Sequence, residues 1–199
     1  MHLHAPGVTG LTKARAILAA MPMPMPLPTA RAPATAARLF VALWPGPAVR
    51  RALAGCRDRQ AWPAGARPTA DRQLHLTLHF IGAVPAGRVG EVAAALAVPS
   101  AAFELTLDRI EAWPRGLVVC CPAAIPTAMQ HLHAELAGAL RQLALPVEPR
   151  PFRPHVTLAR RASPCPPLTQ PGPLRWPVHD HVLVQSIAGA PYRVLRRYR

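Results

Sequence analysis

The run Leu74-His-Leu-Thr-Leu-His-Phe-Ile-Gly82 contains a short pattern, His-x-Thr-Leu, that returns in Pro154-His-Val-Thr-Leu-Ala-Arg160. Each copy lies in an apolar run that is typical of a β-strand. Side chains of a strand alternate between its two faces, so the His and Thr of each copy share one face and the apolar residues take the other. Two such strands placed across a cleft would present two imidazoles and two hydroxyls to one small space.

The charge of the chain favours a phosphate-bearing partner. Lys and Arg together number 23 against 9 Asp and Glu, the formal net charge is +14, and Lys13 is the only lysine. Arginine presents a planar fork that matches phosphate oxygens and keeps its charge. A strongly basic small protein usually meets a polyanion, most often nucleic acid. A GC-rich coding sequence would also raise the arginine content, so charge supports this partner without proving it.

Length and composition limit the class of protein. The 199 residues suffice for one domain, or for two small lobes that share a core. No stretch of about 18 residues is free of charge and proline, which predicts no membrane-spanning helix. The cysteines form no CxxC pair, so we expect neither a zinc site nor a disulfide framework, but reduced thiols in a cytoplasmic protein. These cysteines are Cys56, Cys120, Cys121 and Cys165, of which the adjacent pair is expected in the core.

The first 37 residues differ from the rest. They include Met21-Pro-Met-Pro-Met-Pro-Leu-Pro28, in which every second residue is proline. Such a run can form neither a helix nor a central strand. We therefore expect residues 1–37 to be a disordered, Pro- and Ala-rich extension and residues 38–199 to be the folded domain. A signal peptide around residues 13–20 is the less favoured alternative, because its apolar core is short and prolines follow closely.

The remaining pattern predicts alternating strands and helices. Expected strands cover 38–44, 73–81, 103–113, 116–121, 153–161, 178–187 and 192–198; expected helices cover 45–60, 87–97 and 126–145; expected turns cover 82–85 and the hairpin Pro114-Arg115-Gly116. The last helix carries an apolar stripe formed by Met129, Leu132, Leu136, Leu140 and Leu143. Each motif strand follows a helix, and the motifs begin 80 positions apart (155 − 75), which indicates a duplicated architecture in which two lobes contribute one motif each.

Three segments together resemble one family. Arg38-Leu-Phe-Val-Ala42, the 74–82 run and Pro151-Phe-Arg-Pro-His-Val-Thr-Leu-Ala-Arg160 are similar to the two-histidine (2H) phosphoesterase superfamily. Within it, the chain resembles the bacterial and archaeal RNA 2′,3′-cyclic phosphodiesterases, also called 2′-5′ RNA ligases. The resemblance runs from Arg38 to the C-terminus and includes Ser186 and Pro191-Tyr192-Arg193. It implies a bilobal α+β fold, with two pseudo-symmetric lobes that each carry an antiparallel sheet and helices, and an active-site cleft between them.

The resemblance also implies an activity. The reaction would open the 2′,3′-cyclic phosphate of an RNA end or a cyclic nucleotide to a 2′-phosphomonoester. It would need no metal, cofactor, membrane or obligatory protein partner, and the enzyme would act as a monomer. By the family pattern His155 is the base, His75 is the acid, and Thr77 and Thr157 donate to the non-bridging oxygens. Paired histidine catalysis predicts a bell-shaped pH–rate profile. The alternatives are 2′-5′ RNA ligation and RNA binding without turnover.

Two arginines next to the second motif are candidates for binding the phosphate. Strand parity places Arg153 on the face of His155. Parity turns Arg160 away unless the strand twists or ends there, although the family pattern has an arginine at that position. For each residue, the alternative is a solvated surface side chain.

Other histidines carry weaker hypotheses. His79 shares parity with the first motif, so it lines the same cleft or simply sits at the strand end, and we favour the strand end. His179 and His181 could converge as ligands of a metal-dependent hydrolase, but a third nearby ligand is lacking.

Overall fold

The computed structural model describes residues 36–199. The predicted extension therefore lies outside the described residues, except for Ala36 and Ala37, which open the first strand. That strand, β1, covers Ala36–Leu43 and so begins two residues before the predicted one.

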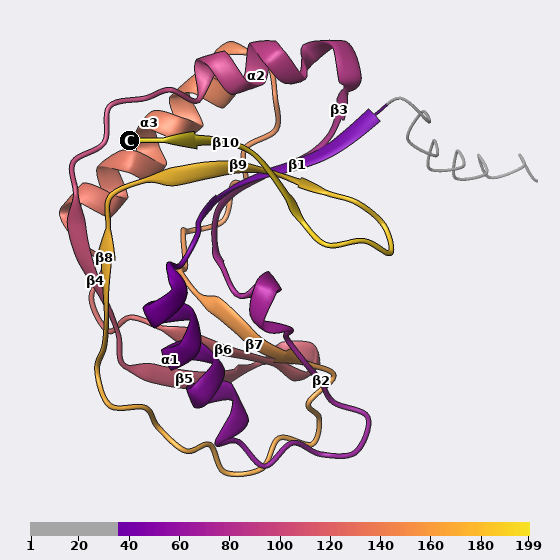
Figure 1. The fold of residues 1–199 in the computed structure, drawn as a ribbon, viewed down its shortest axis with the longest axis vertical. Helices are drawn as coiled ribbons and strands as arrows, with labels where there is room; N and C mark the ends of the chain where they lie inside the picture. Colours follow the sequence, from indigo (N-terminus) through magenta and orange to yellow (C-terminus); the bar gives the residue numbers. More distant parts are fainter. Residues whose placement is uncertain (1–35) are drawn as a thin grey trace, which may run out of the picture. The chain divides into compact units, whose positions relative to one another are not determined.

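Most strands belong to one antiparallel sheet (Figure 1). The strands are β1 (Ala36–Leu43), β2 (Arg67–Pro68), β3 (Leu76–Pro85), β4 (Phe103–Leu107), β5 (Arg109–Trp113), β6 (Leu117–Cys121), β7 (Val156–Arg160), β8 (Leu174–Val178), β9 (His181–Ser186) and β10 (Arg193–Tyr198). Eight of them follow the order β10-β9-β1-β3-β7-β6-β5 with β2 added on β7, while β4 and β8 form a separate two-stranded sheet. The helices are α1 (Pro47–Asp58), α2 (Val89–Ala95) and α3 (Thr127–Gln142). The predicted α+β class is confirmed.

The large sheet consists of two halves that meet at one residue pair. The half β10-β9-β1-β3 and the half β7-β6-β5 with β2 are joined by the antiparallel pair Leu76–Val156. Both side chains are fully buried. This pairing joins the two halves into one sheet, whereas the predicted lobes would each carry a separate sheet. The division into two pseudo-symmetric lobes stays a prediction.

The helices α1 and α3 each pack against the half of the sheet other than the one next to them in the chain. α1 follows β1 in the chain but packs against β7 and β8, whereas α3 precedes β7 but packs against β3 (Figure 1). Pro47 opens α1, where its fixed φ suits the first turn and its missing N–H is not needed. This exchange ties the two halves together from both sides.

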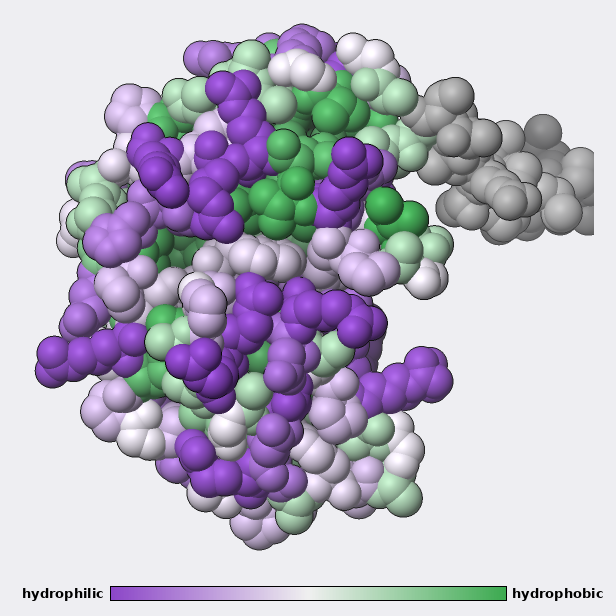
Figure 2. Space-filling view, in the orientation of Figure 1, coloured by the Kyte–Doolittle hydropathy of each residue, from purple (hydrophilic) through white to green (hydrophobic). Residues whose placement is uncertain are grey.

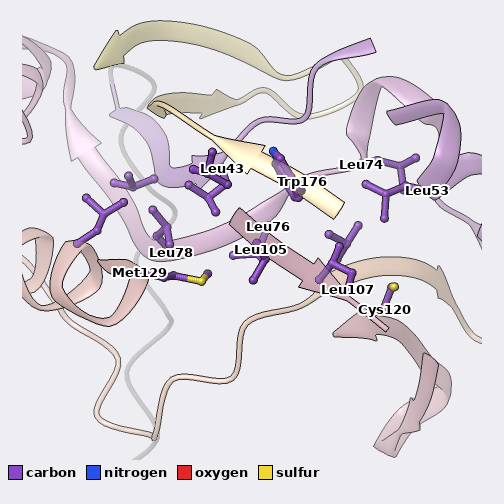
Figure 3. Packing of buried hydrophobic residues seen from close by; sticks show 14 of the residues in the cluster. Leu43, Leu53, Leu74, Leu76, Leu78, Leu105, Leu107, Cys120, Met129 and Trp176 are labelled. Atoms are coloured by element: carbon purple, nitrogen blue, oxygen red, sulfur yellow. The ribbon is translucent and has the colours of Figure 1, made fainter. Parts of the chain in front are cut away.

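One hydrophobic cluster runs through both halves (Figure 3). Leu43, Leu76 and Leu78 from the first half lie in the same cluster as Cys120 from the second, and β4 adds Leu105. The stripe predicted on α3 is confirmed at four of its positions; Leu143, just past the helix end, is only partly buried. Hydrophilic side chains cover much of the face shown in Figure 2, with apolar ones in smaller patches.

Both motif strands contain a β-bulge directly after the motif threonine. In β3, Ala42 faces Thr77 and Val41 faces His79, so Leu78 is the extra residue. In β7, Val119 faces Thr157 and Val118 faces Ala159, so Leu158 is the extra residue. A bulge resets the alternation of side chains.

The consequence of the two bulges is visible in the burial pattern. Two consecutive residues are buried in each strand, and the next residue, Phe80 or Arg160, is exposed. Phe80 thus shares a face with Thr77, and Arg160 shares a face with Thr157.

Some predicted elements were wrong. The expected turn at 82–85 is part of β3, whose Pro85 pairs with Ala36 in β1; Gly82 adopts a φ of 87°, which lets the strand bend without stopping. The expected strand 103–113 is two strands in different sheets, because the chain changes partner at Asp108. The expected strand 178–187 corresponds to β9 and shares only Val178 with β8, so β8 and the two-residue strand β2 were not predicted.

The hairpin at Pro114–Gly116 is confirmed and joins β5 to β6. Gly116 has a φ of 67°, and a Cβ there would lie 2.8 Å from the backbone nitrogen of Ala162. Only glycine meets both requirements. The backbone N–H of Ala162 donates to the Gly116 carbonyl at 2.9 Å, which fastens the end of β7 to this hairpin.

The adjacent cysteines Cys120 and Cys121 lie in the core, as predicted. Cys56, Cys120 and Cys121 are buried free thiols, and Cys165 is half-buried and also free. Among residues 36–199, no helix combines the length and apolarity needed to cross a bilayer.

We predict that Leu76→Ala destabilises the protein by about 2–5 kcal/mol, because it removes a fully buried side chain at the only pair that joins the two halves. The measurement is the free energy of unfolding in urea. Leu53→Ala, also fully buried but on α1, is the control for the loss of side-chain volume, and Ile187→Ala, at an exposed position, should change little. A Leu76→Ala variant as stable as Ile187→Ala would contradict the role of this pair.

Candidate active site

The four motif side chains meet in one cavity. His75 and His155 each precede the first residue of a strand, and those first residues, Leu76 and Val156, pair antiparallel. One step to either side, His75 lies opposite Thr157, and Thr77 lies opposite His155. All four line a cavity of about 550 Å³.

The two imidazoles are anchored in the same way. Nδ1 of His75 lies 2.6 Å from the carbonyl oxygen of Gln73, and Nδ1 of His155 lies 2.8 Å from that of Arg153. A carbonyl can only accept, so Nδ1 carries the proton and donates it in both bonds. In the neutral ring Nε2 is then the free acceptor, which is the arrangement a proton-transferring pair requires.

Aromatic side chains fix the planes of these rings. The Trp44 ring stacks on the His75 ring with centroids 5.6 Å apart. Phe40 and Tyr192 also pack against the His75 ring, at 5.0 and 5.4 Å between centroids. On the other side, the Trp113 ring lies 4.6 Å from the His155 ring.

Trp113, which packs against His155, is held in place by two charged side chains. Trp113 Nε1 donates to a carboxylate oxygen of Glu111 at 2.7 Å, and the guanidinium of Arg153 lies 4.2 Å from the centroid of the Trp113 ring. Arg153 also pairs with Glu111 at 3.5 Å. The same residue thus gives its carbonyl to His155 and clamps the tryptophan beside it.

Both imidazoles are neutral near pH 7 when no anion is bound. Burial lowers the pKa of His75 to about 4, the bond to the Gln73 carbonyl works against this, and the nearby His155 and Arg160 lower it further. Burial also lowers the pKa of His155, with Arg160 and Arg153 acting in the same direction. The effect of His155 on His75 agrees with their convergence on one space.

The cavity is cationic. Arg38, Arg67 and Arg160 line it, and its lining contains no carboxylate from residues 36–199. A half-buried neutral histidine pair beside three guanidiniums is a site prepared for an anion.

The two candidate arginines have different locations. Arg160 lines the cavity because the bulge at Leu158 turns it to the face of Thr157. Arg153 is not in the lining: it precedes β7, so strand parity does not apply, and it packs on Trp113 as described above. A role of Arg153 in binding the phosphate stays a prediction.

His79 faces away from the cavity. The bulge at Leu78 reverses its parity, and the side chain is 2 % exposed. Its Nε2 lies 2.9 Å from the carbonyl oxygen of His133 on α3, and the rings of His79 and His133 stack at 4.0 Å between centroids. His79 thus does not line the cavity, but the favoured prediction that it sits at the strand end was wrong, because β3 continues to Pro85 and the bulge turns the side chain to the other face.

The alternative metal site lacks its donors. His181 is fully buried, with Nε2 3.0 Å from the Leu96 carbonyl oxygen and its ring stacked on Tyr198, whereas His179 is exposed on the preceding loop. No group of three or more His, Cys, Asp or Glu side chains suited to a metal ion occurs in the part of the chain from 36 to 199.

Several lining residues were not assigned to the site from the sequence. These are Arg38, Phe40, Arg67, Pro68, Thr69, Gln73, Phe80, Ser186, Ala188 and Tyr192. Arg38, Ser186 and Tyr192 lie in segments that carry the family resemblance, which is a signal that could have found them. Phe80 and Arg67 required the bulge and the pairing of β2, which the pattern of apolar residues does not reveal.

Comparison with known proteins identifies a family. A family model described as the 2′-5′ RNA ligase superfamily matches residues 45–186, which include both motifs. The RNA 2′,3′-cyclic phosphodiesterase of Thermus thermophilus is 32% identical, over 81% of this chain and 89% of that protein. The protein of the same name from Escherichia coli is 34% identical, over 68% of this chain and 78% of that protein.

Solved structures give the same result. The crystal structure of Escherichia coli LigT complexed with 3′-AMP matches with a TM-score of 0.75 and 28% identity, over 82% of this chain and 97% of that one. The structure of TT0787 from Thermus thermophilus matches with a TM-score of 0.69 and 29% identity, over 81% and 96% of the two chains.

We predict that His75 stays neutral, with its proton on Nδ1, as pH is lowered through 6.5, and that it takes up a second proton only near pH 4. The measurement is a ¹⁵N NMR titration of the imidazole nitrogens, assigned with His75→Gln. The urea-unfolded protein, in which His75 has lost its burial, is the control. Titration of His75 at or above 6.5 in the folded, ligand-free protein would contradict the described environment.

Proposed function

The chain belongs to the 2′-5′ RNA ligase superfamily, and we propose that it hydrolyses the 2′,3′-cyclic phosphate of RNA ends to a 2′-phosphomonoester. The observation that carries the proposal is the convergence of His75, Thr77, His155 and Thr157 on one cationic cavity, with both imidazoles anchored through Nδ1. The proposal includes cyclic nucleotides as small substrates, action as a monomer, and a cytoplasmic location.

The two histidines divide the proton transfers. Nε2 of His155 takes a proton from a water molecule as its oxygen attacks phosphorus. The bond from phosphorus to the ribose 3′-oxygen breaks, and Nε2 of His75 gives that oxygen a proton. The products are a 2′-phosphate and a free 3′-hydroxyl. His155 then releases its extra proton to solvent and His75 takes one up, which restores both residues. Each imidazole needs one nitrogen free for this, which the shared Nδ1 anchoring provides.

The threonines act on the charge that develops at phosphorus. The hydroxyls of Thr77 and Thr157 donate to the non-bridging oxygens, and these bonds strengthen as the five-coordinate phosphorus gains negative charge. The two threonines line the same cavity as the two histidines, which supports this role. The rate effect therefore falls mainly on the chemical step.

Substrate binding also supplies the acid. His75 must carry a second proton, yet its pKa of about 4 leaves it neutral near pH 7 before substrate binds. A phosphate anion placed between the imidazoles and Arg160 offsets the cations and favours the charged imidazole, so the pKa of His75 rises on binding. The productive protonation state is thus tied to the presence of substrate.

The remaining lining residues fit a nucleotide. Arg160 affects both imidazoles, which suits it to bind the reacting phosphate. Phe80 is 49% exposed and presents an aromatic ring to the cavity, with the guanidinium of Arg38 5.0 Å from its centroid. A terminal base can stack on such a ring.

The alternative functions differ in what they need from the site. Ligation would use the same four side chains, but the 5′-hydroxyl of a second RNA end would attack phosphorus in place of water. Simple RNA binding needs the arginines but not two imidazoles that are each anchored through Nδ1. This duplicated anchoring favours an enzyme over a binding module.

We predict that the protein converts adenosine 2′,3′-cyclic phosphate to adenosine 2′-phosphate in the presence of EDTA. His75→Ala and His155→Ala should each lower kcat by about 10²–10⁴-fold, because each removes one proton transfer. Product chromatography distinguishes the 2′- from the 3′-phosphate. His131→Ala, at an exposed position on α3, is the control and should keep full activity. A 3′-phosphate product, a loss of activity in EDTA, or an active His75→Ala enzyme would each refute the scheme.

Thr77→Val and Thr157→Val should each lower kcat about 10²–10³-fold with a smaller change in KM, because valine keeps the shape of threonine but cannot donate to the transition state. Steady-state kinetics on the cyclic nucleotide provide both constants. Thr106→Val, a half-buried position on β4, controls for removal of a strand hydroxyl. An increase in KM alone would mean that the hydroxyls bind substrate and transition state equally.

A further inference from the structure

Two arginines of the cavity are direct neighbours across a strand pair. Arg67 of β2 is paired with Arg160 of β7, and Pro68 is paired with Ala159. The backbone N–H of Thr69 continues this pairing by donating to the Leu158 carbonyl at 2.8 Å. Like charges placed directly opposite one another destabilise a strand pair. Before a ligand binds, the protein therefore carries an unfavourable cationic pair at this point.

Nothing in the described protein neutralises this pair. Neither guanidinium makes a side-chain hydrogen bond or an ion pair with any residue between 36 and 199, whereas Arg88 and Arg150 are held by nearby carboxylates. Both Arg67 and Arg160 line the cavity, whose lining has no carboxylate from the described chain. The pair is matched by anions that arrive with the ligand.

The two arginines lie on different strands of the cavity wall. Arg160 is on β7, the strand that carries Thr157, and it lowers the pKa of both His75 and His155. Arg67 lies opposite Arg160 on the neighbouring strand β2. A ligand with a second phosphate next to the first would offer one anion to each arginine.

The segment that carries Arg67 is held in place from behind. Arg57, a nearly buried residue of α1, donates from Nη1 to the carbonyl of Thr69 and to Asp71, the latter at 2.6 Å. The same segment provides the Gln73 carbonyl that anchors His75. The backbone of this segment is therefore held relative to the catalytic histidine before ligand binds, so that only the side chain of Arg67 has to be ordered on binding.

We infer that Arg67 binds the phosphodiester immediately upstream of the terminal cyclic nucleotide, so that the site prefers RNA ends over free cyclic mononucleotides. This inference rests on the proposed function for the position of the reacting phosphate. An RNA end brings one phosphate for Arg160 and one for Arg67, while a mononucleotide leaves Arg67 without a partner. Arg67 is a specificity residue, and it takes no part in proton transfer.

The test compares substrates with and without the second phosphate. We would measure kcat/KM at 0.15 M salt for adenosine 2′,3′-cyclic phosphate, for the dinucleotide ApA ending in a 2′,3′-cyclic phosphate, and for the same dinucleotide with a neutral methylphosphonate between its nucleosides. The proteins are wild type, Arg67→Gln and Arg72→Gln. Arg72 is exposed three residues from the Thr69 anchor and outside the cavity lining, so its variant removes the same charge at a neighbouring place.

Arg67→Gln should keep kcat/KM on the mononucleotide within about twofold and lower it about tenfold or more on the dinucleotide, as for loss of a hydrogen bond to a charged group. The methylphosphonate should impose the same loss on wild type and none further on Arg67→Gln. Arg72→Gln should behave as wild type. An equal effect of Arg67→Gln on all three substrates, or no effect on any, would overturn the inference.

A binding measurement separates this inference from the proposed function. If wild type leaves both the mononucleotide and the dinucleotide cyclic phosphate unhydrolysed, the proposed function fails. The inference is then decided by dissociation constants for 3′-AMP and for ApA with a 3′-phosphate, measured by calorimetry. Wild type should bind the dinucleotide about tenfold more tightly and Arg67→Gln should lose that preference; equal affinities in wild type would refute it.

Discussion

The pairing of Leu76 with Val156 is the contact on which the site depends. It is the one residue pair that joins β3 to β7, and both side chains are fully buried. Because the pair is antiparallel, the residues on either side of it come together crosswise, and each histidine faces the threonine of the other motif. A hydrophobic contact behind the sheet thus sets the distance between two polar pairs in front of it. Changes of volume there would act on the geometry of catalysis as well as on stability.

The two bulges convert a repeated sequence into an asymmetric site. After each motif threonine one residue is inserted, and the third residue beyond the threonine returns to the cavity face. In β3 that residue is Phe80, and in β7 it is Arg160. The same structural position holds an aromatic ring on one side and a cation on the other. A nucleotide has a base at one end and a phosphate at the other, so this difference can orient it within a nearly symmetric frame.

The sequence was informative where the signal is periodic. The repeated His-x-Thr pattern, the stripe on α3 and the hairpin at Pro114–Gly116 follow from residue types and spacing, and the structure agrees with them. Bulges leave no such pattern, since two consecutive buried residues also occur in ordinary central strands. This is why strand parity gave His79 the wrong face and why Arg160 needed the family pattern. The change of sheet at Asp108 was likewise hidden, because β4 and β5 form one continuous run in the sequence.

Charge and protonation in this site are consequences of the same geometry. Burial keeps both imidazoles neutral, and the three lining arginines have no carboxylate in the lining from the described chain to offset them. Binding of an anion therefore has two effects. It neutralises the guanidiniums, and it allows His75 to take up the proton that the reaction uses. A neutral ligand of the same shape would do neither. Selectivity for a phosphate and readiness for acid catalysis thus arise from one arrangement of side chains.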